Sequence, residues 1–285
     1  LRLTSLKCLE RNSVENPMCG IAGLVDIKRQ LDGNELALQA KQMADALHHR
    51  GPDMGGQWTD TPSGLALAFR RLAIIDLTPS GHQPMLSANG RFAIVYNGEV
   101  YNYQELRQQL LDDGCRFRGT SDTEVILEAF CHWGIETTVK RLIGMFAIAL
   151  WDCEARRLWL IRDRLGIKPL YFGSVDDRFF FASELKALRA VNGWKPEVDR
   201  DAVAGFLRYN YIPAPRSIYR NVFKLPPGSL LSLRPGEDPA VARYWTMADV
   251  IRQERAEVTD EWAIGTAEGL MRDAIRRRMV ADVPL

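Results

Sequence analysis

A cysteine directly after a methionine gives the first chemical signal in the sequence. Cys19 follows Met18 and opens an apolar run that reaches Val25. Removal of Met18 would leave the thiol and a free α-amine on one residue. Because an α-amine has an ordinary pKa of about 7.7–8.0, it can serve as the general base for that thiol near neutral pH. The alternative is that Cys19 is a small buried residue opening a strand, as most free cysteines are.

An Asn-Gly pair follows a strong predicted strand over residues 92–96. The side-chain amide of Asn97 and the N–H of Gly98 could both donate to one developing negative charge, which is the arrangement of an oxyanion hole. As an isolated dipeptide, Asn-Gly is more often a hairpin turn. Taken alone, the pair therefore predicts a turn.

Two charged residues could bind the polar ends of an amino acid. Arg71 lies next to a predicted strand over residues 65–69 and could hold a carboxylate through two parallel hydrogen bonds, although arginines at strand ends are usually solvated. Asp122 lies in the first turn of a predicted helix, where the helix dipole stabilises a carboxylate by about 0.3–1 kcal/mol. It could pair with a substrate ammonium group or be only a favourable N-terminal charge.

The elements that must position these residues follow from periodicity and capping patterns. Apolar spacing predicts a helix over residues 34–48, and the loop His49–Asp53 follows it. The adjacent His48 and His49 lack further metal ligands nearby, so we expect the loop to be ordered by polar contacts. Two capping boxes, at residues 102–105 and 121–124, predict helix starts. The spacing of later short strands predicts antiparallel hairpins, over residues 145–151, 157–161, 170–172 and 179–182.

The last third of the chain has a different character. Residues 192–196 read as a linker, a helix with an aspartate cap is predicted over residues 199–209, and a strand over 229–233. A long helix is predicted over residues 259–280. The charged connector 162–168 contains Leu165 and Ile167, which would suit a packed boundary between domains.

Composition limits the class of protein. The 285 residues are 46% hydrophobic and 26% charged with a formal net charge of +1, so bulk charge favours neither nucleic acid nor membrane as a partner. Five scattered cysteines without CxxC spacing favour a reducing compartment over a disulfide framework or a zinc site. No apolar stretch is long enough to span a bilayer, and we expect a cytoplasmic protein.

Taken together, the motifs resemble the glutamine-hydrolysing asparagine synthetases and, more broadly, the class II glutamine amidotransferases. The resemblance covers nearly everything after Pro17, and its strength lies in the order of the motifs. The matching runs are Met18–Ile21, His49–Asp53, Arg71–Asp76, Tyr96–Asn102, Ser121–Glu124, Gly144–Ala147, Arg162–Gly166 and Ser183–Leu188.

The resemblance implies a role for each matching residue. Cys19 would attack the side-chain amide of glutamine to give a glutamyl thioester and ammonia, with its own α-amine as the base. Asn97 and the Gly98 N–H would form the oxyanion hole, and Arg71 would hold the α-carboxylate. The remaining substrate contacts would come from Glu99 and Asp122 at the α-amino end and from the backbone around Leu72 and Ile74.

The implied fold is α+β, the four-layer αββα sandwich of N-terminal nucleophile hydrolases, followed by the truncated start of an α/β synthetase domain. We expect residues 1–18 to be a leader or a mis-assigned upstream segment. Residues 19–190 would form the amidotransferase domain, and residues 191–285 the linker and first part of an asparagine synthetase domain. The connector 162–168 would then face the synthetase side.

The implied function is the glutaminase half of an asparagine synthetase. The partners would be glutamine and, in the full-length protein, aspartate and ATP; a homodimer is left open. By the same resemblance, the glutaminase domain would need no cofactor and no metal. ATP and Mg²⁺ would bind a Ser-Gly-Gly-x-Asp-Ser loop, which we expect to follow Leu285.

A chain with residues before Cys19 should be inactive as a glutaminase, because an amide nitrogen is not a base. We expect Met18 to be the true start, since Leu1 is not a start residue, with removal of a propeptide as the alternative. Rival functions are an amidotransferase of surface-polysaccharide or amino-sugar biosynthesis with another ammonia acceptor, and a non-catalytic assembly domain.

Overall fold

The computed structural model describes residues 18–72, 81–252 and 258–279. The helices are α1 (Gly33–Asp45), α2 (Tyr103–Asp112), α3 (Asp122–Trp133), α4 (Ile135–Arg141), α5 (Leu185–Leu188), α6 (Arg200–Tyr209), α7 (Met247–Ile251) and α8 (Asp260–Arg278), with a short 3₁₀ helix, η1 (Thr61–Ser63). The strands are β1 (Gly20–Asp26), β2 (Met54–Asp60), β3 (Leu65–Arg71), β4 (Met85–Leu86), β5 (Phe92–Val100), β6 (Gly144–Asp152), β7 (Arg157–Arg162), β8 (Tyr171–Val175), β9 (Arg178–Ala182), β10 (Val222–Lys224), β11 (Ser229–Leu233) and β12 (Ala240–Arg243).

These strands form two six-stranded sheets. The first sheet has the order β10-β8-β9-β1-β3-β2, and the second has the order β12-β11-β7-β6-β5-β4. Every strand pair described is antiparallel. The prediction of antiparallel hairpins is therefore confirmed. It also follows that β1, which begins directly after Cys19, lies in the interior of its sheet between β9 and β3.

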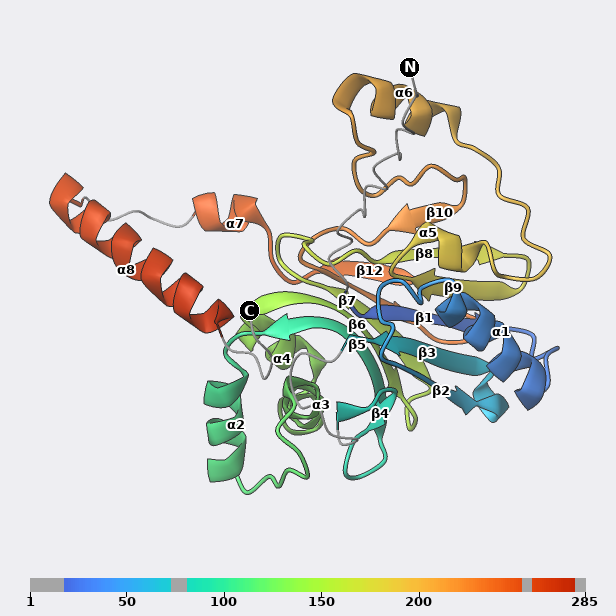
Figure 1. The fold of residues 1–285 in the computed structure, drawn as a ribbon, viewed down its shortest axis with the longest axis horizontal. Coiled ribbons are helices and arrows are strands. Elements are labelled where there is room, and N and C mark those ends of the chain that lie inside the picture. The colour runs from blue at the N-terminus through green and yellow to red at the C-terminus, as the bar shows by residue number, and fades with distance from the viewer. Residues whose placement is uncertain (1–17, 73–80, 253–257, 280–285) are drawn as a thin grey trace, which may run out of the picture.

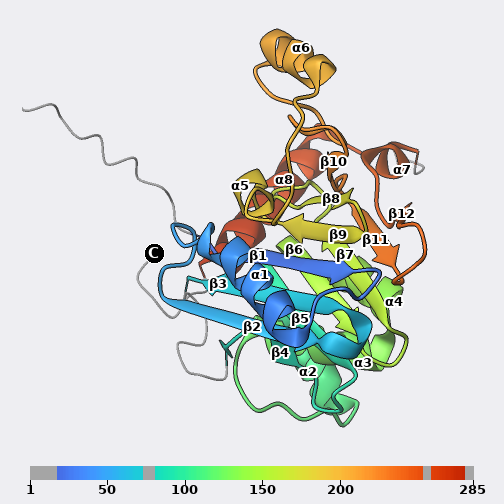
Figure 2. The ribbon, with the colours of Figure 1, turned by 90° about the vertical axis from the view of Figure 1, so that its right-hand side faces the viewer.

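The two sheets pack face to face and are covered by helices on both outer sides (Figures 1 and 2). A buried apolar cluster fills the space between them, with Ile21 and Phe69 from the first sheet and Val95 and Trp151 from the second. Helices α1 and α5 cover the first sheet, whereas α2, α3 and α4 cover the second. The four-layer αββα sandwich is thus confirmed.

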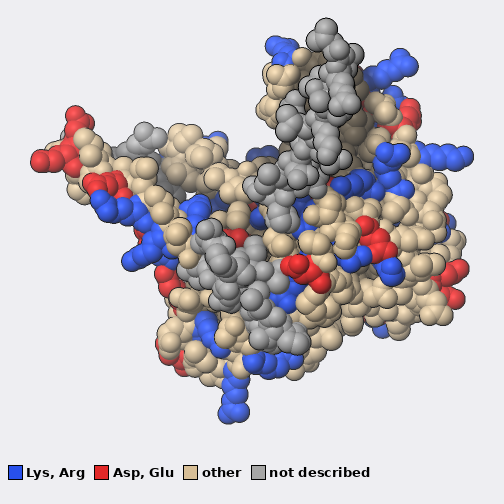
Figure 3. Space-filling model, viewed as in Figure 1, with Lys and Arg blue, Asp and Glu red and all other residues tan. Residues whose placement is uncertain are grey.

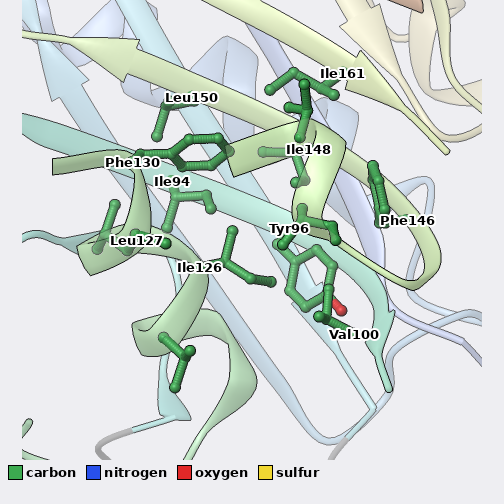
Figure 4. Close-up of a cluster of buried hydrophobic side chains, with 14 of the residues drawn as sticks. Ile94, Tyr96, Val100, Ile126, Leu127, Phe130, Phe146, Ile148, Leu150 and Ile161 are labelled. Atoms are coloured by element: carbon green, nitrogen blue, oxygen red, sulfur yellow. The ribbon is translucent and has the colours of Figure 1, made fainter. Parts of the chain in front are cut away.

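Side-chain alternation along β5 explains how one strand serves two layers. Ala93 and Val95 point into the cluster between the sheets, whereas Ile94 and Tyr96 point toward α3. Figure 4 shows Ile94 and Tyr96 packed against Ile126 and its neighbours on that helix. A residue at position 97 therefore lies on the inter-sheet side of the strand.

The isolated prediction of a hairpin turn at Asn97 and Gly98 is wrong. Both residues lie inside β5, which pairs with β6 without interruption from Phe92 to Val100. A Cβ atom on Gly98 would lie 2.2 Å from the carbonyl oxygen of Met145, so the close approach of the two strands requires glycine there. The nine-residue ladder outweighs the local turn preference of the dipeptide.

The two predicted capping boxes also differ from the structure. The Asn102 side chain makes no cap at α2; its amide donates to the carbonyl of Arg141 (3.0 Å) and its oxygen accepts from the Ile143 N–H (2.9 Å). At α3, the Ser121 hydroxyl accepts from the Glu124 N–H at 3.3 Å, as predicted. The carboxylate of Glu124 instead accepts from the backbone N–H groups of residues 118 and 119. Long-range contacts thus replace the Asn102 cap, whereas Glu124 bonds the loop just before α3.

Residues after 190 contribute strands to both sheets. β10 extends the first sheet beside β8, and β11 with β12 extends the second beside β7. The predicted strand over residues 229–233 and the helix capped by Asp199 are confirmed as β11 and α6. Helix α6 projects away from the sandwich (Figures 1 and 2). The domain boundary at residue 190 stays a prediction.

The connector 162–168 is folded back onto the sandwich by its charged residues. The buried guanidinium of Arg162 donates to the carbonyls of Lys168, Gly166 and Leu225 at 2.6–2.8 Å. Leu165 and Ile167 are exposed. The charged side chain of Arg162 thus holds the connector in place, and the side chains of Leu165 and Ile167 lie on the surface beside α8.

Helix α8 carries acidic residues in its first turn and Arg276–Arg278 in its last turn, which complements the helix dipole. Figure 3 shows this separation, with red at the outer end of the helix and blue closer to the sandwich. Arg277 bonds Glu105 at 2.7 Å, and Arg278 lies 4.7 Å above the ring of Tyr101. None of the helices in the ranges 18–72, 81–252 and 258–279 combines the length and hydropathy that a membrane-spanning helix needs.

Candidate active site

Strand register places Cys19 beside the predicted carboxylate ligand. Gly20 pairs with Arg70, so Cys19 lies opposite Arg71 at the ends of β1 and β3. The thiol sits between the two backbone polar groups of Leu72: Sγ donates to the carbonyl and accepts from the N–H, each at 3.4 Å. Backbone groups at the end of the neighbouring strand therefore fix the position of the thiol.

The loop after α1 holds the backbone of the same residue. Arg50 donates from Nε to the Cys19 carbonyl (3.0 Å) and from Nη1 to the Glu184 carboxylate (2.8 Å), which also contacts His49 Nε2 at 3.1 Å. Next to Glu184, the Ser183 hydroxyl accepts from the Ile21 N–H at 3.0 Å. These contacts give the His49–Asp53 loop the ordering role that the sequence predicts.

A single pocket collects most of the predicted substrate-binding residues. Cys19, Arg71, Leu72, Gly98, Glu99 and Asp122 all line it, together with Phe69, Gly81, Gln83, Tyr96, Ser121 and Thr123. Asn97 precedes Gly98 on the inter-sheet side of β5. Ile74 lies outside the described residues, so its predicted role stays a prediction.

The amide nitrogen of Asn97 is a hydrogen-bond donor that the described ranges leave unused. Nδ2 is buried and has no partner among the described residues. A buried donor without a partner costs free energy, on the order of 1–3 kcal/mol, and native structures rarely keep one without a reason. A donor left open in this way can bind a negatively charged oxygen when one forms.

The N–H of Gly98 is a second open donor, as the strand ladder shows. Gly98 pairs with Phe146, whose N–H and carbonyl are both bonded to Asp163 on the β7 side, at 3.2 and 2.9 Å. In an antiparallel ladder, the N–H of Gly98 must then point away from β6. On that side the N–H of Tyr96 bonds Gln83 Oε1 (2.6 Å) and the N–H of Val100 bonds Asp122, but no described residue accepts from Gly98.

Asp122 is a buried carboxylate held from two sides. One of its oxygens accepts from the Tyr96 hydroxyl at 2.8 Å and from the Val100 N–H at 3.2 Å. Burial raises the pKa of Asp122 to about 6, although both hydrogen bonds oppose the shift. Above that pH the site holds a negative charge that can attract a substrate ammonium group.

Cys19 itself is held mainly as a thiol. Burial raises its pKa, and the Leu72 backbone and the positive charges of Arg71 and Lys168 oppose that shift. Burial likewise raises the pKa of Glu99 and lowers that of Lys168. A base is therefore needed to take the thiol proton before the sulfur can attack.

Sequence reasoning missed Gln83 and Tyr96. Gln83 reads as part of a turn, yet it is buried, and its side chain bonds both Tyr96 and Thr123. The alternation along β5 would have placed Tyr96 on the side of α3, where Asp122 begins the helix. No sequence pattern links Gln83 to that helix, because 40 positions separate Gln83 from Thr123.

The described residues include no group of three or more histidines, cysteines, aspartates or glutamates that could hold a metal ion. The described part of the pocket presents a thiol, two open donors and opposite charges at separate positions. Such a pocket can bind an amino acid by both charged ends and stabilise an oxyanion on its side chain.

Comparison with known proteins agrees with this geometry. A family model described as glutamine amidotransferase domain matches residues 18–245. Asparagine synthetase [glutamine-hydrolyzing] 1 of Bacillus subtilis is 33% identical over 271 residues, covering 94% of this chain and 41% of that protein. Amidase chry2 of Gibberella zeae is 34% identical over 278 residues, covering 94% of this chain and 40% of that protein.

A solved structure of glutamine phosphoribosylpyrophosphate amidotransferase from Bacillus subtilis, with ADP and GMP, has the same fold. Its TM-score is 0.59 at 21% identity, over 80% of this chain and 50% of that one. This chain spans about two fifths of the length of the asparagine synthetases that it matches. The chain belongs to the glutamine amidotransferase domain family, and it matches the glutaminase half of the glutamine-hydrolysing asparagine synthetases.

Proposed function

We propose that this chain hydrolyses glutamine to glutamate and ammonia at the pocket beside Cys19, once Cys19 is the first residue. The two adjacent open donors, Asn97 Nδ2 and the Gly98 N–H, carry the proposal. A purely structural site would satisfy them within the fold, whereas an acyl-transfer site needs them for the oxyanion.

The free α-amine of Cys19 takes the proton of its thiol, and the sulfur attacks the amide carbon of glutamine. The resulting oxyanion accepts hydrogen bonds from the two open donors. Collapse of this intermediate breaks the C–N bond, and the amine returns its proton to the leaving ammonia. Water then hydrolyses the glutamyl thioester to glutamate and restores the thiol.

Charge at the two ends of the pocket orients the substrate. Arg71 would pair with the α-carboxylate, and Asp122 with Glu99 would bind the α-ammonium group. Leu72 positions the thiol, and the backbone at Ile74 would complete the pocket. Because the two charged ends select an amino acid, a simple amide without them should be a poor substrate.

The ammonia acceptor is proposed from the relatives. The matching Bacillus subtilis proteins are named asparagine synthetases and are more than twice as long as the matched region. We propose that ammonia amidates aspartate with ATP and Mg²⁺ in a longer protein, at residues other than these. This chain has no Ser-Gly-Gly-x-Asp-Ser sequence. The four described cysteines are free thiols, which fits the proposed cytoplasmic location.

The proposal is tested with two forms of the protein, one beginning at Cys19 and one retaining Met18. Mass spectrometry establishes each N-terminus, and coupled assays measure glutamate and ammonia released from glutamine. We expect equal amounts of both products from the Cys19 form and at least a 10³-fold lower rate from the Met18 form. Equal rates from the two forms would rule out the α-amine as the base, and no product from either would rule out the function.

A further inference from the structure

A buried lysine next to the nucleophile has no carboxylate partner among the described residues. Lys168 is almost fully buried, and its Nζ donates to the sulfur of Met18 at 3.0 Å. Its backbone N–H bonds Asp163, but no ion pair involves its ammonium group in the described ranges. Because burying an unpaired charge is costly, such a lysine is a candidate for a functional role.

The contact with Met18 limits how far the ammonium lies from the catalytic nitrogen. Five covalent bonds separate Met18 Sδ from the backbone nitrogen of Cys19. With the 3.0 Å contact, they place Lys168 Nζ within about 9 Å of that nitrogen. The proposed function requires this nitrogen to become a free α-amine, so the present inference rests on that function.

Several other charges face the same region from the surrounding elements. Glu99 comes from β5, and Asp163 follows β7, and both favour a charged lysine. Arg50, from the loop after α1, opposes it. The remaining charges that act on Cys19 are those of Arg71 on β3 and Asp122 on α3. Lys168 is the cation among these that contacts the residue preceding Cys19.

We propose that the Lys168 ammonium keeps the Cys19 α-amine unprotonated near neutral pH, so that the amine can accept the thiol proton. A positive charge nearby disfavours protonation of an amine and lowers its pKa. In a buried site this effect is screened less than in water. Lys168 acts through the amine and does not touch the substrate, so it is a positioning residue.

The pH dependence of kcat at saturating glutamine tests the proposal, because kcat reports the ionisations of the enzyme–substrate complex. For wild type, we expect the acidic limb at a pH below about 7.7, the lower ordinary value for an α-amine. In Lys168→Met we expect that limb to move up by on the order of one pH unit, with the loss of turnover largest at low pH. Lys168→Arg should keep the wild-type limb, since it keeps the charge.

Lys224 supplies the matched control. It is a partly buried lysine whose Nζ donates to the Ile212 carbonyl, and burial lowers its pKa as it does for Lys168. Lys224→Met removes a similar charge away from the pocket and should leave the limb unchanged. If Lys168→Met fails to fold, as judged by its unfolding transition, Lys168→Gln replaces it.

The possible results separate this inference from the proposed function. Wild type with a verified Cys19 N-terminus that releases no ammonia would remove the proposed function. If wild type is active but the acidic limb of its kcat profile lies at or above the ordinary pKa of an α-amine, the role of Lys168 is overturned, whatever the variants show. An unchanged limb in Lys168→Met would overturn it as well.

Discussion

The same strands build two regions of opposite character. One is the apolar cluster between the two sheets, and the other is the polar pocket at the strand ends. Between the sheets, Trp151 is fully buried among apolar side chains, and its indole N–H bonds Asp60 at 3.0 Å. At the pocket, Asn97 has an open donor within the described ranges and Asp122 is a buried carboxylate, and the buried ammonium of Lys168 contacts Met18 nearby.

This difference separates stability from chemistry along a single strand. β5 places Val95 in the apolar cluster and Gly98 in the pocket three residues later. Open donors and buried charges lower the free energy of unfolding. A protein can keep them only where a large, well-packed core stabilises the same strands. Variants in the core should therefore lower the free energy of unfolding with little effect on glutamine turnover. Variants in the pocket should lower turnover with little effect on the free energy of unfolding.

The largest effect is expected from Trp151→Ala, which tests the core side of this contrast. Loss of the buried ring leaves a cavity and should lower the free energy of unfolding by about 3–5 kcal/mol. Chemical denaturation monitored by circular dichroism measures it. Turnover of the fraction that remains folded should stay within about threefold of wild type, since the ring does not line the pocket.

Trp151→Phe is the conservative control and should lose a smaller part of that stability. If Trp151→Ala were to abolish glutamine hydrolysis while remaining fully folded, core and pocket would be coupled. The proposed separation would then be wrong.

Asn97→Ala tests the pocket side. Removal of one oxyanion donor should lower kcat about 10²–10³-fold while glutamine still binds. Stability should be unchanged or slightly higher, because the variant removes a buried donor that has no partner in the described part of the chain. Steady-state kinetics and isothermal titration with glutamine measure the two effects.

Asn34→Ala, at an exposed position in the first turn of α1, serves as the matched control and should keep wild-type turnover. Near wild-type turnover in Asn97→Ala would remove the oxyanion assignment. A large loss of stability in that variant would instead show that Asn97 has a structural role.

The smallest effect is expected from Tyr96→Phe. The Tyr96 hydroxyl stabilises the ionised form of Asp122, so its loss should raise the pKa of Asp122 further above about 6. If Asp122 binds the substrate ammonium as proposed, only its ionised form attracts that group, so KM for glutamine should rise as pH falls through that pKa. In the variant this rise should begin about one pH unit higher, with kcat little changed.

Measurement of KM from pH 5 to 9 checks this shift, with Tyr103→Phe on α2 as a matched tyrosine outside the pocket. A pH-independent change in KM would mean that Tyr96 acts by packing alone. At pH 8.5 the two enzymes should be alike, because Asp122 is ionised in both.

Local sequence signals succeeded where one short segment carries the whole interaction. The Asp199 cap of α6 bonds the N–H groups of residues 201 and 202. The apolar stripe of α1 buries Leu36, Ala40 and Met43, as its spacing predicts. Both depend on contacts within a few residues or on a single periodic face, so neighbouring residues suffice to determine them.

The same signals failed where a distant strand decides the outcome. Asn97 and Gly98 continue a strand because nine residues of β5 pair with β6. The Asn102 side chain bonds residues about 40 positions away instead of capping α2. β2 had no clear strand pattern because it contains Gly55 and Gly56. At Gly56 a Cβ would lie 1.9 Å from the Gln83 carbonyl oxygen, so the tertiary structure requires the glycine.

The sequence by itself determined which residue types were available: a thiol on a residue able to become N-terminal, an amide before a glycine, and charges of both signs. The order of its motifs determined the family and therefore the αββα fold. Only the tertiary structure decided that Gly98 and Asn97 keep open donors, that Tyr96 holds Asp122 and that Lys168 lies beside Met18. These facts depend on strand register and on contacts between segments up to 150 positions apart, which no local pattern encodes.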